Sequence, residues 1–287
     1  MSDEAAQMNK LILVAGTGRS GTTWLADLLN YRKTYRIIFE PFHRDFVPEW
    51  SRFSYAQYFA PEFQDTAALE AAGRILTGQV SGSWVDRSAE VNEKNCGCII
   101  KEIRANLMLG WLKRNFPGLR IIYIIRNPFA VALSSVRAGW QYDLKGVFLS
   151  QTDLVRDVLA PYAGLVRDTS ETLIKFIILW CIEQRLALRD LENAQDSKIV
   201  FYERLVLDPL RELRPVSDFI GDEFSDEILK FTAISSWSRV TSSTDRRGII
   251  KKGFFSGYPS TVDGWLTEIS SGERALGMEI IESFGLS

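Results

Sequence analysis

Residues 11–29 read LILVAGTGRSGTTWLADLL, and this stretch decides the fold. Its first five residues are apolar and predict a short β-strand. Gly16, Gly18 and Gly21 then interrupt the apolar run, and from Thr22 onward apolar residues recur at helical spacing. A strand, a glycine-rich loop and a helix together predict an anion site, because the N–H groups of the loop and the positive end of the helix converge there.

The loop differs from that of a P-loop NTPase at one position. In those enzymes a lysine follows the last glycine and contacts the terminal phosphates of ATP or GTP, whereas this chain has Thr22 there. The loop instead carries a cation at Arg19, beside the hydroxyl groups of Ser20, Thr22 and Thr23. These donors favour a phosphate or phosphosulfate group bound without magnesium triphosphate. The alternative is a glycine-rich turn ahead of an ordinary helix.

Length and composition describe an ordinary globular protein. The 287 residues are enough for one large domain with a substantial core. Hydrophobic residues make up 46% of the chain and charged residues 24%, and the formal net charge is −2. This balance gives no attraction of the whole chain to nucleic acid, so we expect no nucleic-acid partner.

The cysteines and the N-terminus indicate a cytoplasmic protein. Three cysteines cannot build a disulfide framework, and the Cys96-Gly97-Cys98 spacing is too short for a zinc pair, so no metal is expected. Residues 1–9 predict a flexible start rather than a signal peptide, because they carry acids and no apolar core. The longest apolar run, residues 176–182, is too short to span a bilayer, and no integral membrane segment is predicted.

Strand and helix patterns alternate from residue 11 to residue 221. After the first strand, further strands are predicted over residues 35–39, 98–100, 120–125 and 198–202. Helices are predicted over residues 67–76, 107–116, 172–191, from Asp208 onward, 261–269 and 273–284. This alternation predicts an α/β fold in a single domain, residues 1–287: a P-loop-like, doubly wound sheet of about five parallel strands flanked by helices. Within the predicted strand 120–125, residues 121–125 are all apolar, which predicts an inner strand that is covered on both faces.

Charged residues stand at the ends of the predicted strands. Glu40 precedes Pro41, which disfavours helix at Glu40, and Lys101 and Arg126 end two further strands. Because ligands bind at the carboxyl ends of parallel strands, we expect these side chains to face one crevice, with a solvated lysine as the alternative for Lys101. Glu40 is a candidate general base, with a surface acid or helix cap as the alternative. His43, the only histidine, is the other candidate base, with a structural role or a place merely near the site as the alternative.

Two later features complete the predicted site. Arg126 and Ser134, which lies two turns along the following helix, can share one anion. Residues 140–170 and 235–260 are predicted to cap the site. Within the second segment, residues 246–252 contain four cations, which form either a basic lid on the nucleotide or a solvated loop. Whether this run contacts a phosphate stays open.

These pieces resemble the sulfotransferases that use 3′-phosphoadenosine 5′-phosphosulfate (PAPS), over nearly the whole chain. Residues 16–23, with the run Arg-Ser-Gly-Thr-Thr, resemble their 5′-phosphosulfate loop, and residues 123–128 with Ser134 resemble their 3′-phosphate motif. Two shorter stretches, 39–41 and 101–104, are similar to the carbohydrate branch. Two others, 202–209 and 238–245, are similar to the tyrosylprotein branch.

The resemblance implies that PAPS is the donor and that the product is 3′-phosphoadenosine 5′-phosphate (PAP), without a metal. It implies that Arg19 contacts the sulfonate and the bridging oxygen that leaves with the nucleotide. It also implies that Ser20, Gly21, Thr22 and Thr23 hold the 5′-phosphate.

The same resemblance implies roles for residues farther along the chain. Arg126 and Ser134 would bind the 3′-phosphate, and Tyr202 would lie near the adenine. Lys101 and Ser243 match residues that steady the departing group.

Comparison with the branches of this family also shows differences. Glu40 matches the acidic base of the tyrosylprotein branch, whereas the cytosolic branch uses a histidine from another segment and has a lysine in place of Arg19. Residues 246–248 are similar to a basic-glycine lid of that cytosolic branch. The N-terminal membrane anchor that is usual in the Golgi enzymes is missing from this sequence.

The sequence therefore predicts O-sulfation of a hydroxyl on a carbohydrate or small molecule by in-line transfer from PAPS. Two alternatives stay open: a P-loop nucleotide or nucleoside phosphotransferase, and a non-catalytic nucleotide-binding protein of the same fold. The identity of the acceptor and the oligomeric state, with a homodimer among the alternatives, also stay open.

Overall fold

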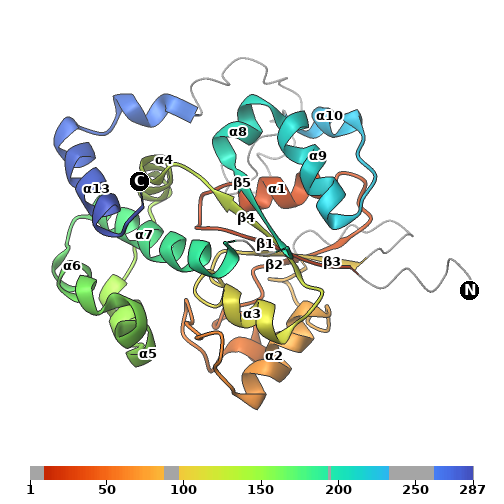
Figure 1. Ribbon diagram of the computed structural model, residues 1–287, viewed down its shortest axis with the longest axis horizontal. Coiled ribbons are helices and arrows are strands. Elements are labelled where there is room, and N and C mark those ends of the chain that lie inside the picture. Colours follow the sequence, from red (N-terminus) through yellow and green to blue (C-terminus); the bar gives the residue numbers. More distant parts are fainter. Residues whose placement is uncertain (1–9, 87–96, 193–194, 233–261, 287) are drawn as a thin grey trace, which may run out of the picture.

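Five parallel strands lie at the centre of the part of the chain that the computed structural model describes, residues 10–86, 97–192, 195–232 and 262–286 (Figure 1). The strands are β1 (Lys10–Ala15), β2 (Arg36–Phe39), β3 (Gly97–Glu102), β4 (Arg120–Ile125) and β5 (Ser197–Phe201). Their order in the sheet is β2-β3-β1-β4-β5, and every neighbouring pair is parallel. This topology confirms the predicted α/β fold with about five parallel strands.

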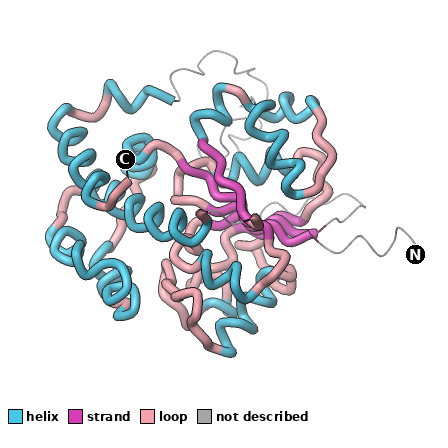
Figure 2. The backbone as a smooth tube through the Cα atoms, viewed as in Figure 1, coloured by secondary structure: helices cyan, strands magenta, loops and turns pink. Residues whose placement is uncertain are grey.

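Helices cover both faces of the sheet and extend beyond one side of it (Figures 1 and 2). One face carries α1 (Thr22–Leu29), α8 (Tyr202–Leu207), α9 (Pro209–Ile220) and α10 (Leu229–Thr232). The other carries α2 (Thr66–Leu76) and α3 (Leu109–Asn115). Beside the sheet lie α4 (Pro128–Arg137), α5 (Thr152–Leu154), α6 (Ala163–Asp168), α7 (Thr172–Leu191) and α13 (Ser271–Ser283). Short 3₁₀ and π segments are η2 (Pro48–Trp50), η3 (Lys145–Leu149), η4 (Val155–Leu159), η5 (Ala160–Tyr162), η6 (Asp226–Ile228) and η8 (Gly264–Thr267).

The strands are apolar on both faces because helices cover both. In β1, Ile12 and Val14 belong to the cluster that contains the buried residues of α1, whereas Leu13 and Ala15 belong to the cluster that contains those of α2 and α3. The unbroken apolar run of β4 is buried in the same way, with its residues divided between the same two clusters. The prediction of an inner strand over residues 120–125 is therefore confirmed.

The long helix α7 is buried along most of its length and has the predicted bounds. It packs against α4 and α13 through apolar side chains that include Phe176 and Ile177. Two polar residues of α7, Glu183 and Gln184, are also buried. They lie on the part of the helix nearest to the glycine-rich loop, since Gln184 contacts Thr17.

Several predicted boundaries were wrong. The third strand continues to Glu102, so Lys101 lies within β3, where an ion pair with Glu40 accompanies its burial. The fifth strand ends at Phe201, and Tyr202 begins α8, because its ring packs inward against Trp24. The helix predicted over 261–269 is represented by the short segment η8.

The remaining predictions concern the segment 140–170, residues that the structure does not describe, and membrane-spanning helices. The segment 140–170 forms η3 to α6, whose buried side chains join the cluster around α7. The predictions for residues 1–9, for 235–260 with its basic run 246–252, and for Ser243 lie outside the described residues. None of the described helices combines the length and the hydrophobicity that a bilayer-spanning helix requires.

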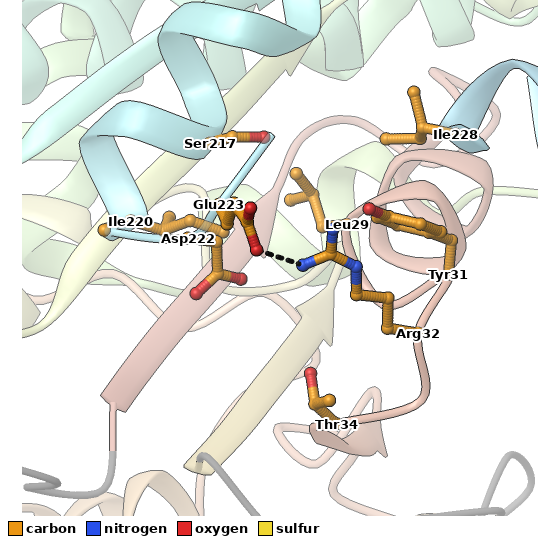
Figure 3. A pocket seen from close by; sticks show the side chains of 10 residues that line it. Leu29, Tyr31, Arg32, Thr34, Ser217, Ile220, Asp222, Glu223 and Ile228 are labelled. Atoms are coloured by element: carbon orange, nitrogen blue, oxygen red, sulfur yellow. Dashed lines mark ion pairs between the residues drawn. The ribbon is translucent and has the colours of Figure 1, made fainter. Parts of the chain in front are cut away.

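A pocket lies at the amino end of the sheet, between the ends of α1 and α9 (Figure 3). Its charged groups are engaged with one another or with neighbours. Arg32 Nη1 lies 3.6 Å from Glu223 Oε2, and Asp222 Oδ1 accepts hydrogen bonds of 2.6 Å from both Lys10 Nζ and Tyr35 Oη. The predicted site residues lie at the opposite, carboxyl end of the strands.

Candidate functional site

The glycine-rich loop, residues 16–21, follows the central strand β1 at the point where the strand order reverses. Strand β3 lies on one side of β1 and β4 on the other, and open parallel sheets bind ligands at such a point. The loop is closed by a hydrogen bond of 3.0 Å from the N–H of Ser20 to the carbonyl of Thr17. Helix α1 begins directly after Gly21, so its positive end faces the loop.

Three side chains predicted to bind anions converge on this loop. Arg126 directly follows β4, and its Nη1 donates to the carbonyl oxygen of Arg19 at 2.9 Å. Trp180 on α7 holds the Arg126 backbone, because its Nε1 donates to the Arg126 carbonyl at 2.9 Å. Arg19 in turn donates its Nε to Oγ of Ser134 on α4 at 3.0 Å. The loop after β1, the end of β4 and helix α4 therefore bring these side chains to one place.

Tyr202 packs directly on the loop. The guanidinium carbon of Arg126 lies 4.3 Å from the centroid of the Tyr202 ring, and the Trp24 ring contacts Tyr202 edge-on at 5.7 Å. A Cβ atom on Gly21 would lie only 2.8 Å from Cδ2 of Tyr202. Glycine is therefore needed at this position for the tyrosine to lie against the loop.

Gly21→Ala is expected to lower the free energy of unfolding by about 1–3 kcal/mol. The added Cβ would clash with Tyr202, and the φ of 96° at Gly21 is unfavourable for alanine. Guanidinium denaturation measures this loss. The matched control is Gly164→Ala in α6, where nothing lies within 4 Å of an added Cβ, and it should stabilise by about 0.5–1 kcal/mol. Equal effects of the two substitutions would contradict the prediction.

Buried donors around the loop fit an anion. Ser20 Oγ, Trp24 Nε1 and Arg126 Nε are buried, and none of them makes a hydrogen bond to a residue that the structure describes. A buried polar group without a partner costs about 1–3 kcal/mol. All three atoms can donate hydrogen bonds, and they belong to the loop, to the first turn of α1 and to the residue that follows β4. Their chemistry matches the oxygen atoms of a phosphate or phosphosulfate group.

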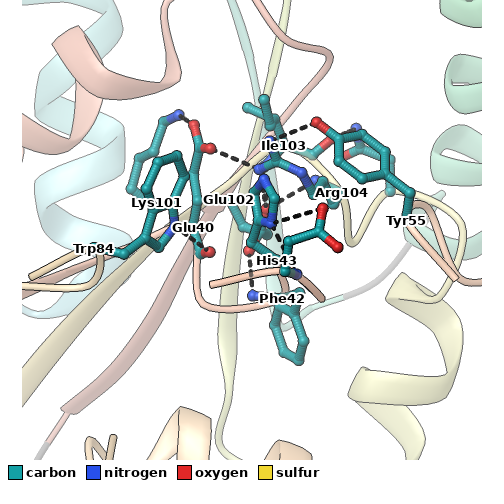
Figure 4. Close-up of polar contacts among 11 residues, drawn as sticks. Glu40, Phe42, His43, Tyr55, Trp84, Lys101, Glu102, Ile103 and Arg104 are labelled. Atoms are coloured by element: carbon teal, nitrogen blue, oxygen red, sulfur yellow. Dashed lines mark hydrogen bonds and ion pairs between the residues drawn. The ribbon is translucent and has the colours of Figure 1, made fainter. Parts of the chain in front are cut away.

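Glu40 directly follows β2 and forms the centre of a buried ion cluster (Figure 4). Lys101 donates its Nζ to Oε1 of Glu40, and Arg104 donates its Nη1 to Oε2 at 2.6 Å. Arg104 is itself oriented by Tyr55, whose hydroxyl accepts a 2.7 Å hydrogen bond from Nη2. The carboxylate of Glu40 is thus held by one cation on each oxygen.

The backbone of Glu40 is strained and held from two sides. Its φ of 44° lies in the left-handed region, which costs a non-glycine residue about 1–3 kcal/mol. Its N–H donates to the carbonyl of Lys101 at 2.7 Å, and its carbonyl accepts from Trp84 Nε1 at 3.1 Å. Arg19 also lies in the left-handed region, with a φ of 72°. Glu40 and Arg19, which the sequence predicts to lie closest to the reacting atoms, therefore both have unusual backbone conformations.

The electrostatic environment distinguishes the two candidate bases. Burial raises the pKa of Glu40, but Lys101 and Arg104 outweigh it and lower this pKa to about 2. The pKa of His43 falls to about 4, because burial and the nearby Arg104 both disfavour the imidazolium. Nδ1 of His43 accepts a hydrogen bond of 3.3 Å from the N–H of Asp45. At neutral pH, Glu40 is therefore ionised and His43 is neutral.

The side chains around the glycine-rich loop lie next to the ion cluster around Glu40. Residue Ala15, which precedes the loop, is in register with Glu102 of β3. A Cβ on Gly18 would lie 3.4 Å from Cδ1 of Ile103, the residue just before Arg104. The glycine-rich loop and the Glu40 cluster thus occupy neighbouring strand ends of one sheet edge.

Aromatic side chains border this edge. Phe46 is 54% exposed and stacks on Trp84 with ring centroids 4.3 Å apart, and His43 packs against both rings. On the side of the loop, the guanidinium of Arg19 lies 5.5 Å from the centroid of the Trp140 ring. The site therefore has charged groups at its centre and aromatic rings at its border.

Sequence reasoning missed several residues of the site. Arg104 belongs to the quoted motif 101–104 but was not predicted to lie in the site; its signal was a second cation three residues after Lys101. Asp27 lies on α1, and burial raises its pKa to about 7, although Lys101 lowers it. Its signal was an acid among the apolar residues of a helix. No sequence pattern indicated Trp84 as a site residue, because its contact with Glu40 joins residues that lie far apart in the chain.

The described site residues that the sequence predicts fall into two groups. The first group lies around the glycine-rich loop and comprises Arg19, Ser20, Gly21, Arg126, Ser134 and Tyr202, with Thr22 and Thr23 beside it at the start of α1. The second group comprises Glu40, His43 and Lys101. Within the described ranges, no three histidine, cysteine or acidic side chains lie close enough together to hold a metal ion.

Comparison with known proteins gives a consistent picture. The model of a family described as "Sulfotransferase family" matches residues 12–226 of this chain. The nodulation protein NoeE of Sinorhizobium fredii (strain NBRC 101917 / NGR234) is 25% identical over 273 residues, which are 94% of this chain and 63% of NoeE. This chain thus spans less than two thirds of the length of that relative.

Two solved structures share the fold. The sulfotransferase domain from the curacin biosynthetic pathway superimposes with a TM-score of 0.56 at 16% identity, covering 98% of this chain and 99% of that domain. The sulfotransferase domain of the Synechococcus PCC 7002 olefin synthase gives a TM-score of 0.52 at 17% identity, covering 97% and 95%. At these identities the likeness supports the fold.

Proposed function

Because the chain belongs to the sulfotransferase family, we propose that it transfers a sulfuryl group from PAPS to an acceptor hydroxyl by in-line displacement. The convergence of Arg19, Arg126 and Ser134 supports this proposal most strongly. A donor with phosphates at both ends of its ribose needs two anion-binding sites at the right separation from each other. Two motifs that lie 107 residues apart in the chain supply adjoining cations.

The loop residues hold the donor in this proposal. The hydroxyl and N–H groups from Ser20 to Thr23 bind the 5′-phosphate at the start of α1. Arg126 and Ser134 bind the 3′-phosphate, and the Tyr202 ring lies near the adenine. The unpaired buried donors Ser20 Oγ and Arg126 Nε support this arrangement, because an anion satisfies both.

The charged cluster takes the proton of the acceptor hydroxyl and stabilises the negative charge on the departing phosphate oxygen. Transfer needs an oriented acceptor oxygen, a base for its proton and positive charge on the departing phosphate oxygen. Arg19 and Lys101 supply that charge, and Glu40 accepts the proton. In the structure Lys101 is paired with Glu40. An anionic donor competes with Glu40 for the lysine, which raises the pKa of Glu40 towards the range of an effective base.

The acceptor is a carbohydrate or small molecule with a flat, partly apolar face. The stacked rings of Phe46 and Trp84 lie beside Glu40, and Trp84 is hydrogen-bonded to the Glu40 backbone. Exposed aromatic rings bind the apolar faces of sugars and ring systems while leaving hydroxyl groups free to react. Mass spectrometry of acceptor mixtures incubated with PAPS identifies which hydroxyl is sulfated.

3′,5′-ADP is expected to raise the melting temperature by about 5–10 °C at a concentration 100 times its Kd. ATP at the same concentration should raise it much less, because Thr22 replaces the lysine that ATP-binding loops use. Differential scanning fluorimetry measures both shifts. Arg126→Ala should reduce the shift with 3′,5′-ADP, since the substitution removes a cation of the 3′-phosphate site.

Other outcomes of this measurement favour the alternatives. A larger shift with ATP, together with ATP hydrolysis, would favour a phosphotransferase. Tight binding of 3′,5′-ADP without sulfate transfer to any acceptor of a broad panel would favour a non-catalytic binding protein.

A further inference from the structure

Glu203 follows Tyr202 at the start of α8 and has no part in the proposed reaction. Its Oε1 accepts a hydrogen bond of 2.9 Å from the backbone N–H of Asn127, which lies 76 residues earlier in the chain. The ring of Tyr202 contacts the Arg126 guanidinium at 4.3 Å. Two consecutive side chains of α8 thus hold the two consecutive residues that follow β4.

The contact of Glu203 lies just beyond the end of the sheet. Strands β4 and β5 are in parallel register up to the pair Ile125 and Phe201. The chain then leaves β5 and turns into α8 at Tyr202, so the N–H of Asn127 meets a side chain instead of a strand partner. A partly buried N–H needs an acceptor, and the Glu203 carboxylate supplies it.

Asn127 links the two side chains that bind the 3′-phosphate in the proposed function. Arg126 directly precedes it in the chain. Its own side chain caps α4, because its Oδ1 accepts two N–H groups of the first turn at 3.0 Å and 3.3 Å. Ser134 lies on this helix. A fixed Asn127 backbone therefore sets the position of Arg126 relative to Ser134.

The glycine-rich loop has supports that do not involve Glu203. The N–H of Ser20 donates to the carbonyl of Thr17 at 3.0 Å, and Nε2 of the buried Gln184 donates to Oγ1 of Thr17 at 3.1 Å. The turn after β4 contributes one further bond, to the carbonyl of Arg19. A change at Glu203 should therefore affect the 3′-phosphate site more than the loop.

We propose that Glu203 is a positioning residue that makes the nucleotide site selective for a 3′-phosphate. This inference rests on the proposed function. The acceptor oxygen of Glu203 aligns the site, whereas its negative charge repels a bound phosphate. Glutamine keeps the acceptor oxygen and removes the charge, aspartate keeps the charge but is too short to reach the N–H, and alanine removes both. The three substitutions thus separate alignment from charge.

Calorimetric titration with 3′,5′-ADP and with 5′-AMP measures this selectivity as the ratio of the two Kd values. The wild type should bind 3′,5′-ADP about 10²-fold more tightly, as expected for two hydrogen bonds to a charged phosphate. Glu203→Ala should reduce this ratio about tenfold by weakening 3′,5′-ADP, while the Kd of 5′-AMP changes by less than about twofold. Glu203→Asp should reduce the ratio at least as much, and Glu203→Gln should retain or increase it.

Glu212→Ala is the matched control. Glu212 is another partly buried glutamate in the first turn of a helix, α9, and its replacement should leave the ratio unchanged. A wild-type ratio in Glu203→Ala or in Glu203→Asp would overturn the inference, and so would equal losses in Glu203→Ala and Glu203→Gln. A wild-type protein that binds 5′-AMP as tightly as 3′,5′-ADP would instead overturn the proposed function.

Discussion

Arg19→Ala is expected to lower kcat by about 10²–10³-fold, because a donor that stabilises developing charge typically contributes this much. The guanidinium of Arg19 is held by Ser134 at 3.0 Å and lies over the ring of Trp140, so it is oriented before the substrates arrive. The bond from Arg126 goes to the Arg19 carbonyl, which alanine keeps. The truncation therefore removes the charge at the reacting group and leaves the loop connected to β4. Rates are measured with an acceptor identified by mass spectrometry.

Arg19→Lys is the matched control for this prediction. Lysine keeps the positive charge but loses the forked geometry and the Nε contact with Ser134, so its kcat should lie between those of the wild type and Arg19→Ala. Affinity for 3′,5′-ADP reports whether each variant still folds and binds. A kcat of Arg19→Ala within a few-fold of the wild-type value would remove Arg19 from the proposed reaction.

The sheet could be predicted from the sequence because local signals agree with the tertiary structure. The run 120–125 is apolar at every inner position and is buried in β4, and the 172–191 pattern coincides with α7. Local signals did not predict the secondary structure of Tyr202 correctly. An aromatic residue after an apolar run continues the strand pattern, and only its packing on Trp24 and the loop places it in α8. Tertiary contact decided this boundary.

The charged centre could be predicted only in part for a related reason. Glu40 and Lys101 were recognised at strand ends, where topology alone brings side chains to one edge. Sequence position does not show which charges pair, however. The contact of Arg104 with Glu40 spans 64 residues, and that of Gln184 with Thr17 spans 167. Such contacts depend on how the loop after β3 and helix α7 lie in space.

Glu40→Gln is expected to lower kcat by about 10²–10⁴-fold, the usual contribution of a general base, while 3′,5′-ADP binds at least as tightly as to the wild type. The substitution removes the carboxylate that engages Lys101 and Arg104, so both cations become available to the anionic nucleotide. Loss of binding energy therefore cannot explain the loss of rate. Calorimetric Kd values and single-turnover rates, measured on the same preparation, separate the two effects.

His43→Ala distinguishes the two candidate bases. His43 is neutral at pH 7 and lies beside the Arg104 that holds Glu40, so it is the nearest competitor for the proton. If Glu40 is the base, His43→Ala should retain most of the wild-type rate. Normal turnover of Glu40→Gln with an inactive His43→Ala would assign the proton transfer to the imidazole. The pH profile gives a second distinction: in the free enzyme, the basic form is lost as the pH falls through about 2 for Glu40, and already through about 4 for His43.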